Sequence, residues 1–222
     1  TSLLDYDSPR QGGLIAVRLM GGETAGNDSS NPSDAGQAGV NGGLDELIGA
    51  ALCNSWDDII LVSKHGMSLK FRADDEQLRP MGRQTAGVQG MKFRHGDELL
   101  AMDVVAEDSD KDLLVVTGEG YAKRTGIGEY RLQGRNGYGV KAVQLAEGRG
   151  SLVGALVVSE DDQVMAIMKS GKVIRSNVNE VSRTGRTTQG VTLAKPDSGD
   201  ELIGIARNED TGDDAEETPA AD

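Results

Sequence analysis

A glycine-rich pattern, x-Gly-Arg-x-x-x-Gly-Val, occurs three times in this 222-residue chain. The copies cover residues 81–88, 133–140 and 184–191, and we call them Gly-Arg loops 1, 2 and 3. Their last glycines, Gly87, Gly139 and Gly190, lie 52 and then 51 residues apart. A period near 50 residues is typical of an array of small supersecondary units. The chain is therefore expected to consist of repeated units.

The sequence between the loops predicts strands. Short apolar or β-branched runs are separated by Gly, Asp, Asn and Pro at roughly ten-residue spacing, which is the all-β pattern. In the first unit we expect strands over residues 47–52, 59–63, 67–72 and 88–93. Glycines at 66, 120 and 171 fall between two such runs, where they predict tight hairpins. Four strands in about 50 residues is the size of one propeller blade.

Both ends and one internal segment differ from the repeat. Residues 13–19 match 139–145, and the longer spacing up to Gly87 becomes regular if residues 21–43 are a flexible insertion of small polar residues. That insertion is either a bare surface loop or a segment that binds a partner. Residues 208–222 are expected to be a disordered acidic tail. The run before the tail, residues 202–206, is expected to pair with the first blade and close the ring.

The net charge of −13 argues at first against a nucleic-acid partner, because such binding depends on cations. However, seven acidic residues follow Arg207 and five more lie in residues 19–46, with no cation in either segment. The body of the chain is thus nearly neutral, and its cations lie in turns and loops. A basic face on that body is possible.

Other classes of site receive little support. The single cysteine, Cys53, excludes a disulfide framework within the chain and is expected to be a buried thiol. His65 and His95 stand alone, which disfavours a metal site, and no nucleophile has a recognisable base beside it. No apolar run reaches the length of about 20 residues that a membrane span needs. A cytoplasmic location is the default expectation.

The loops carry the strongest chemical signal. Glycines allow close backbone approach to a ligand, and an arginine among them can fork onto a phosphate. The alternative is a plain turn between blades with a solvated arginine, but three arginines in register favour a phosphate-binding face. A second set of cations follows the hairpin glycines: Lys70, Arg72, Lys123, Arg124, Lys172 and Arg175. They are expected to form either a rim that follows a phosphate backbone or ordinary solvated strand ends. The candidate DNA-binding residues are Arg83, Gln133, Arg135, Arg186, Lys70, Arg72, Lys123, Arg124, Arg131, Lys141, Lys172 and Arg175.

These residues resemble a known family, the C-terminal domain of the A subunit of bacterial DNA gyrase, a type IIA topoisomerase. The resemblance is carried by residues 80–88, 121–125 and 185–191, and it covers nearly the whole chain apart from the insertion and the tail. The family's Gln-Arg-Arg-Gly-Gly-Lys-Gly box is absent. Its nearest counterpart is Gly-Arg loop 2, which matches at Gln133, Arg135, Gly137 and Gly139.

The resemblance implies an all-β, propeller-like β-pinwheel of six four-stranded blades that exchange strands. Residues 1–207 would cover about four blades, three of them in full. It also implies a basic rim that wraps double-stranded DNA, so that ATP-dependent strand passage introduces negative supercoils. No catalytic residue would lie in this chain, because ATP and Mg²⁺ are used elsewhere in an assembly of two A and two B subunits.

Two alternatives remain open from the sequence. The first is the equivalent domain of topoisomerase IV, which would bind DNA by the same physical interactions but serves decatenation more than supercoiling. The second is a propeller scaffold that binds protein partners, which would need aromatic anchors on its surface. Aromatic residues make up only 3% of this chain. The acidic tail is further expected to compete with DNA for the basic rim.

Overall fold

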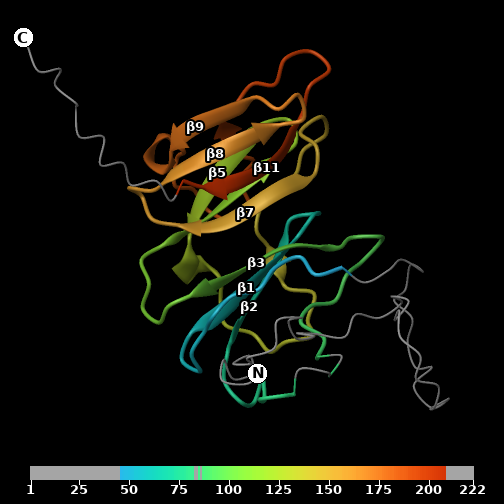
Figure 1. Cartoon of the computed structure of the whole chain (residues 1–222), viewed down its shortest axis with the longest axis vertical. Coiled ribbons are helices and arrows are strands. Elements are labelled where there is room, and N and C mark those ends of the chain that lie inside the picture. The colour runs from blue at the N-terminus through green and yellow to red at the C-terminus, as the bar shows by residue number, and fades with distance from the viewer. Residues whose placement is uncertain (1–45, 83–84, 86, 209–222) are drawn as a thin grey trace, which may run out of the picture.

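The computed structural model describes residues 46–82, 85 and 87–208, which form three antiparallel sheets (Figure 1). The first sheet has the order β3-β1-β2-β6, with β1 (Asp58–Ser63), β2 (Met67–Arg72), β3 (Leu99–Val105) and β6 (Val140–Lys141). The second has the order β10-β5-β4-β7, with β4 (Asp112–Thr117), β5 (Tyr121–Gly126), β7 (Leu152–Val158) and β10 (Val191–Thr192). The third has the order β11-β8-β9, with β8 (Gln163–Met168), β9 (Val173–Asn177) and β11 (Leu202–Arg207). Two short 3-10 helices, η3 (Ile127–Glu129) and η4 (Val178–Glu180), follow β5 and β9.

Each sheet contains a hairpin, as the sequence predicts, and in the two four-stranded sheets the hairpin forms the centre. The turns of β1–β2, β4–β5 and β8–β9 contain Gly66, Gly120 and Gly171, whose φ angles are +80°, +79° and +87°. Residues with a Cβ seldom adopt this left-handed conformation, so glycine is required there. The glycines at the predicted turns therefore serve as turn residues.

The remaining strands of each sheet come from parts of the chain that follow its hairpin. β3 pairs with β1, and β6, which begins at the end of Gly-Arg loop 2, pairs with β2. In the same way β7 pairs with β4, β10 pairs with β5, and β11 pairs with β8. The expectation that β11 pairs with the first blade is therefore wrong. It occupies the same place in the third sheet as β3 does in the first.

Strand exchange also explains two expected strands that do not form. Residues 47–52 are exposed and have no strand pairing. They match the start of β3, which pairs with the hairpin before it in the chain. The described residues contain no hairpin before residue 47, so this segment has no such partner among them. Cys53 follows this segment and is exposed, so the expectation of a buried thiol is wrong. Of residues 88–93, only Met91 makes a bridge, to Gly137.

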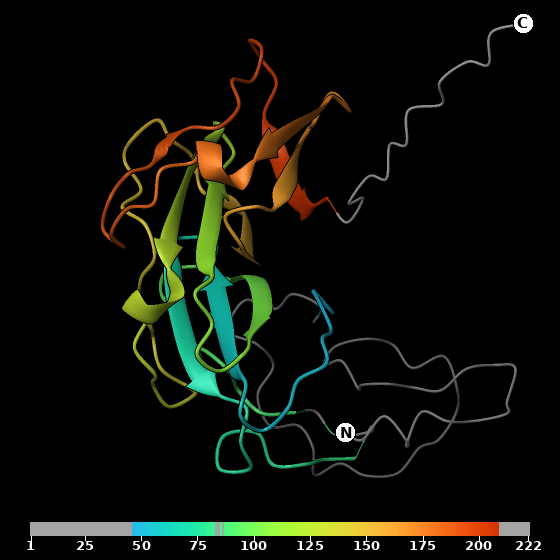
Figure 2. The same ribbon diagram turned by 90° about the vertical axis from the view of Figure 1, so that its left-hand side faces the viewer.

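Apolar residues fill the spaces between successive sheets. In β4, Leu113 and Val115 lie in a cluster shared with the first sheet, whereas Leu114 and Val116 lie in a cluster shared with the third. This alternation follows from the period of two residues in a strand. Figure 2 shows the sheets following one another along the molecule. Each fully buried aliphatic side chain contributes roughly 1.5–3 kcal/mol, so the stacking of sheets stabilises the array.

Asp-Glu pairs at residues 97–98 and 200–201 precede β3 and β11 and bind the hairpins of the same sheets. The Asp97 carboxylate accepts hydrogen bonds from Ser63 Oγ (2.6 Å) and the His65 amide (2.9 Å). Asp200 makes the same contacts with the hydroxyl and the amide of Ser170, at 2.7 and 3.0 Å. Hydrogen bonding from Ser170 lowers the pKa of Asp200. These carboxylates therefore have a structural role.

Residues 13–19, the insertion 21–43, Arg83 and residues 209–222 of the tail lie outside the described residues. Asn208, the first residue of the predicted disordered tail, is held by hydrogen bonds to Gln163. Within the described part of the chain, no helix is long and apolar enough to cross a membrane. The same residues contain no group of three His, Cys, Asp or Glu side chains placed to hold a metal ion.

Candidate nucleic-acid interface

Gly-Arg loops 2 and 3 occupy equivalent places on successive sheets. Their last glycines, Gly139 and Gly190, have φ angles of +71° and +84°. A Cβ on Gly139 would collide with the Ser68 carbonyl oxygen, and one on Gly190 would lie 2.5 Å from the Ala122 carbonyl oxygen. Glycine is thus required here by backbone conformation and by close approach to the hairpin strand. The repeated pattern of the sequence has a physical cause in these contacts.

The arginines of the two loops make the same contact with the loop before. Arg135 Nη1 donates to the Gln89 carbonyl oxygen at 2.9 Å, and Arg186 Nη1 donates to the Lys141 carbonyl oxygen at 3.3 Å. Gln89 and Lys141 each lie two residues after the last glycine of the preceding loop. The two guanidinium groups therefore occupy equivalent positions in a row. Neither has a carboxylate within ion-pair distance among the described residues.

Backbone hydrogen bonds hold neighbouring loops side by side. The Lys92 amide donates to the Gly137 carbonyl oxygen at 2.8 Å, and the Gln144 amide donates to the Thr188 carbonyl oxygen at 3.1 Å. These two bonds are related by the repeat. The loops consequently form a continuous row across the units.

The amides of the two arginines also have equivalent partners. The Arg135 amide donates to Gln77 Oε1 at 2.8 Å, and the Arg186 amide reaches Glu129 Oε2 at 3.4 Å. Gln77 and Glu129 are not among the residues predicted for the site. Their position five residues before the first glycine of a loop is the signal that could have identified them.

Cations without an acidic partner gather along this row. Among the described residues, none of these side chains has a carboxylate within ion-pair distance: Lys92, Arg94, Arg131, Arg135, Lys141 and Arg186. We call them the loop cations. The Arg94 guanidinium lies over the ring of Tyr138, 4.2 Å from its centroid, which joins loop 2 to the segment after loop 1. Gln133 is half-buried at the start of loop 2.

The six predicted cations on the strands after the hairpin glycines behave differently, and we call them the hairpin cations: Lys70, Arg72, Lys123, Arg124, Lys172 and Arg175. Lys70, Lys123 and Arg124 are only 8%, 1% and 6% exposed, so the expectation of an exposed rim is wrong for these three. Segments of the next unit cover them, because Leu132 bridges to Lys70 and Arg183 bridges to Arg124. Which segment covers each cation depends on strand exchange, and the sequence of the hairpin alone does not reveal it.

Most hairpin cations are already neutralised. Arg124 pairs with Asp112 at 3.2 Å, and Arg72 pairs with Asp58 at 2.8 Å. Lys70 lies 3.7 Å from Asp58, and Lys172 lies 3.7 Å from Asp197. A phosphate would have to compete with these carboxylates.

Arg175 differs from the other hairpin cations because it is both exposed and without an ion pair within the described part of the chain. It occupies the place of Lys70 and Arg124 in the third sheet, but Gln163 stands where the other hairpins have Asp58 and Asp112. Arg175 therefore remains available to a phosphate.

Lys123 contacts loop 3 from the interior. Its ammonium donates to the carbonyl oxygens of Gly185 and Arg186, both at 2.6 Å. Burial lowers the pKa of Lys123 to about 8, partly offset by Glu129, while the nearby Arg186 lowers it further. A cation expected on the rim thus lies beneath it.

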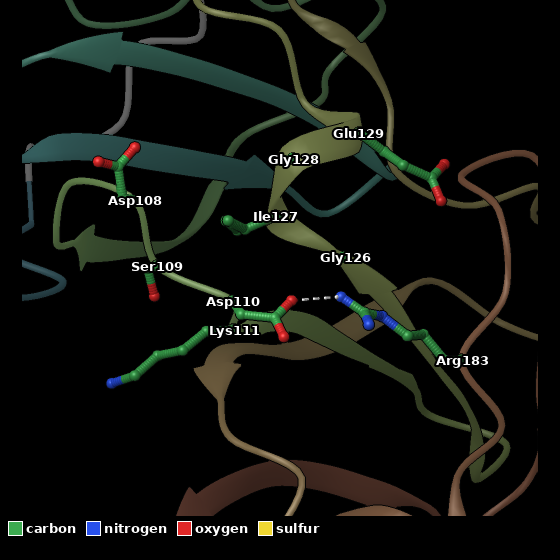
Figure 3. A pocket seen from close by; sticks show the side chains of 9 residues that line it. All are labelled: Asp108, Ser109, Asp110, Lys111, Gly126, Ile127, Gly128, Glu129 and Arg183. Carbon is green, nitrogen blue, oxygen red and sulfur yellow. Dashed lines mark hydrogen bonds and ion pairs between the residues drawn. The ribbon is translucent and has the colours of Figure 1, made fainter.

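An open depression of about 500 Å³ lies between η3 and the loop before β4 (Figure 3). Asp110 and Arg183 face each other there and form an ion pair at 3.2 Å, and Arg183 Nε lies 2.8 Å from Asp112. Lys111 and Glu129 also line it. Because its charges are of both signs and partly paired, this depression provides no uniform field for an anion.

Three segments of the chain, each beginning at a hairpin, match one known family. The family model described as DNA gyrase C-terminal domain, beta-propeller, matches residues 57–106, 111–159 and 162–209. The chain belongs to this DNA gyrase C-terminal domain family. The predicted all-β fold of propeller-like blades is thereby confirmed for a gyrase C-terminal domain.

Relatives with high identity carry the same assignment. The domain is 50% identical to the DNA gyrase A subunit of Streptomyces coelicolor (strain ATCC BAA-471 / A3(2) / M145) over 217 residues, which is 98% of this chain and 23% of that protein. It is 46% identical to the DNA gyrase A subunit of Mycobacterium tuberculosis (strain ATCC 25618 / H37Rv) over 96% of this chain and 23% of that protein. The chain therefore spans less than a quarter of these curated relatives.

Solved structures agree on the fold. The domain superposes on a DNA gyrase A C-terminal domain with a TM-score of 0.61 and 30% identity, covering 68% of this chain and 50% of the other. It superposes on the C-terminal domain of a DNA topoisomerase IV with a TM-score of 0.74, covering 91% of this chain and 56% of the other. At 19% identity the second likeness concerns the fold alone.

Proposed function

We propose that this gyrase C-terminal domain binds duplex DNA along the row of Gly-Arg loops and wraps it. The repeated contact of Arg135 and Arg186 with the preceding loop is the observation that carries the proposal. Each guanidinium has five N–H donors, and the carbonyl contact uses one Nη group. The Nε of Arg135 is buried, so the remaining Nη donors are the ones that can bind a phosphate bidentately. Arginines in equivalent places on successive sheets match the regular spacing of phosphates.

The energetics of wrapping support this role. Smooth bending of a short duplex site costs on the order of 1–6 kcal/mol. A charge-assisted hydrogen bond contributes roughly 1.5–3 kcal/mol before other costs, so a few loop cations offset the bending of each site. Because these contacts go to phosphates, we expect slight sequence preference.

At the level of the whole protein, we propose that the domain serves an ATP-dependent type II topoisomerase. Wrapping would present a DNA segment for strand passage with a fixed handedness, which gives negative supercoiling its direction. The partners would be the rest of the gyrase A polypeptide and the ATPase-bearing B polypeptide, in an assembly of two of each, in the cytoplasm. ATP and Mg²⁺ would bind outside this chain. The identity to gyrase A subunits favours this over the topoisomerase IV alternative.

The test replaces loop arginines in the full-length protein. Arg135→Ala with Arg186→Ala should weaken DNA binding, and the slope of log affinity against log salt should flatten by about 0.9 per lost phosphate contact. Adding Arg83→Ala tests loop 1. The matched control is Lys64→Ala with Lys169→Ala, because these lysines already pair with Glu98 and Glu201. An unchanged affinity and slope in the arginine variant would refute the interface.

A further inference from the structure

Lys123 stands at a position that is apolar in the other two hairpins. Strand register places it opposite Val115, as Leu69 lies opposite Leu61 and Ile174 opposite Ala166. Leu69 belongs to an apolar cluster and lies against Gly137 of loop 2. Burying an ammonium where a leucine would fit is costly unless it is well hydrogen-bonded. Lys123 therefore requires a specific explanation.

The contacts of Lys123 go to the loop that carries Arg186. Its three donors can be satisfied by the carbonyl oxygens of Gly185 and Arg186 at 2.6 Å and by Thr188 Oγ1 at 3.5 Å. The two carbonyls belong to the peptide groups on either side of the Arg186 Cα. One ammonium thus restrains both backbone torsions of Arg186.

Loop 2 holds its arginine without such a lysine. The amide of Arg135 is bound by Gln77 at 2.8 Å, whereas the corresponding bond from the Arg186 amide to Glu129 is longer, at 3.4 Å. Loop 3, where the amide of Arg186 makes the longer contact, is the loop that also receives hydrogen bonds from Lys123. The two loops therefore reach equivalent geometry by different means.

We propose that Lys123 is a positioning residue that orients Arg186 for phosphate binding from beneath loop 3. This inference rests on the proposed DNA-binding function of the row. Lys123 itself is buried and does not touch DNA. Glu129 and Arg186 are the charged groups that act on it, and a phosphate bound at Arg186 would favour its protonated form. DNA affinity should consequently decrease as the pH rises through about 8.

The experiment uses Lys123→Met in the full-length gyrase A polypeptide, assembled with its ATPase partner, and measures binding to linear duplex DNA. We expect about a tenfold loss of affinity, the size of one charge-assisted contact, with the thermal stability of the domain unchanged or higher. A residue with only a structural role would lower both quantities. Lys123→Arg keeps a buried charge that does not titrate near pH 8, so it should retain more affinity than Lys123→Met and lose the pH dependence.

Two comparisons make the result decisive. Lys169→Met, which removes one exposed lysine that already pairs with Glu201, should leave affinity unchanged. Lys123→Met combined with Arg186→Ala should bind no more weakly than Arg186→Ala alone, because Lys123 acts through Arg186. If Arg186→Ala weakens binding but Lys123→Met does not, or if the two losses add, the positioning role is wrong. If Arg186→Ala itself has no effect, the proposed function of loop 3 fails first.

Discussion

Gly190→Ala is the substitution that tests most directly how the loops are attached to the sheets. Gly190 has a φ of +84°, and an added Cβ would lie 2.5 Å from the Ala122 carbonyl oxygen and 3.3 Å from the Lys123 Cβ. Ala122 is backbone of β5 and pairs with Val191 of β10. The obstructing atom is therefore part of the sheet and cannot rotate away. β10 has to move off β5 to accommodate the methyl group.

The cost has two parts. A residue with a Cβ in the left-handed region costs roughly 1–2 kcal/mol. Displacing the short β10 strand loses one or two hydrogen bonds, each contributing about 0.5–1.5 kcal/mol. The sum is about 3 kcal/mol, which corresponds to an increase of roughly a hundredfold in local opening.

Hydrogen exchange of the full-length protein measures this opening at the amides of β5 and β10. Gly171→Ala is the first control, because Gly171 has a φ of +87° but open space around its Cα, so its own turn should lose only about 1–2 kcal/mol. Gly128→Ala is the second control, since Gly128 has neither a positive φ nor an atom within 4 Å of the new methyl group, and it should change little. Equal effects at Gly190 and Gly171 would refute the argument from close approach.

Two further predictions concern buried charges. Asp112→Leu removes the buried partner of Arg124, but Glu160 still pairs with Arg124 at 2.8 Å. It should therefore cost less than the roughly 3–5 kcal/mol lost when a buried charge is left without a partner, and combining it with Arg124→Met should recover part of that loss in a double-mutant cycle measured by thermal unfolding. The second concerns pH: the pKa of Lys123 is about 8 in the folded state and 10.5 ordinarily, so between these values the unfolded chain binds more protons and the unfolding free energy rises with pH. Lys123→Met should remove this rise between about pH 8 and 10.5, and a persistent rise would contradict its assignment to Lys123.

Local features of the fold could be predicted from the sequence. The turn glycines at 66, 120 and 171 and the last glycines of loops 2 and 3 were identified from spacing alone, and all have the positive φ that only glycine adopts easily. These glycines could be predicted because the backbone conformation at one residue depends mainly on its own side chain. The register of Arg135 and Arg186 followed from the same repeat.

Contacts between units could not be predicted in the same way. The burial of Lys70 and Arg124 depends on which segment of the next unit crosses them, and sequence spacing does not specify that crossing. Hairpin register, however, would have placed Asp58 opposite Arg72 and Asp112 opposite Gly126, near the cations they neutralise. Counting outward from the turn glycines could therefore have separated the paired cations from the free ones.

Contacts between successive repeats also determine how the row of loops responds to substitutions. Arg186 is held by Lys141 just after the preceding loop, by Lys123 of the second hairpin and by Glu129 beyond that hairpin. None of these partners belongs to the unit that contains Arg186. The position of each loop arginine is therefore set by the sheet before it, and the angle between successive sheets sets the spacing of the guanidinium groups. A change in packing between two sheets should alter phosphate contacts at the next loop even where every cation is intact.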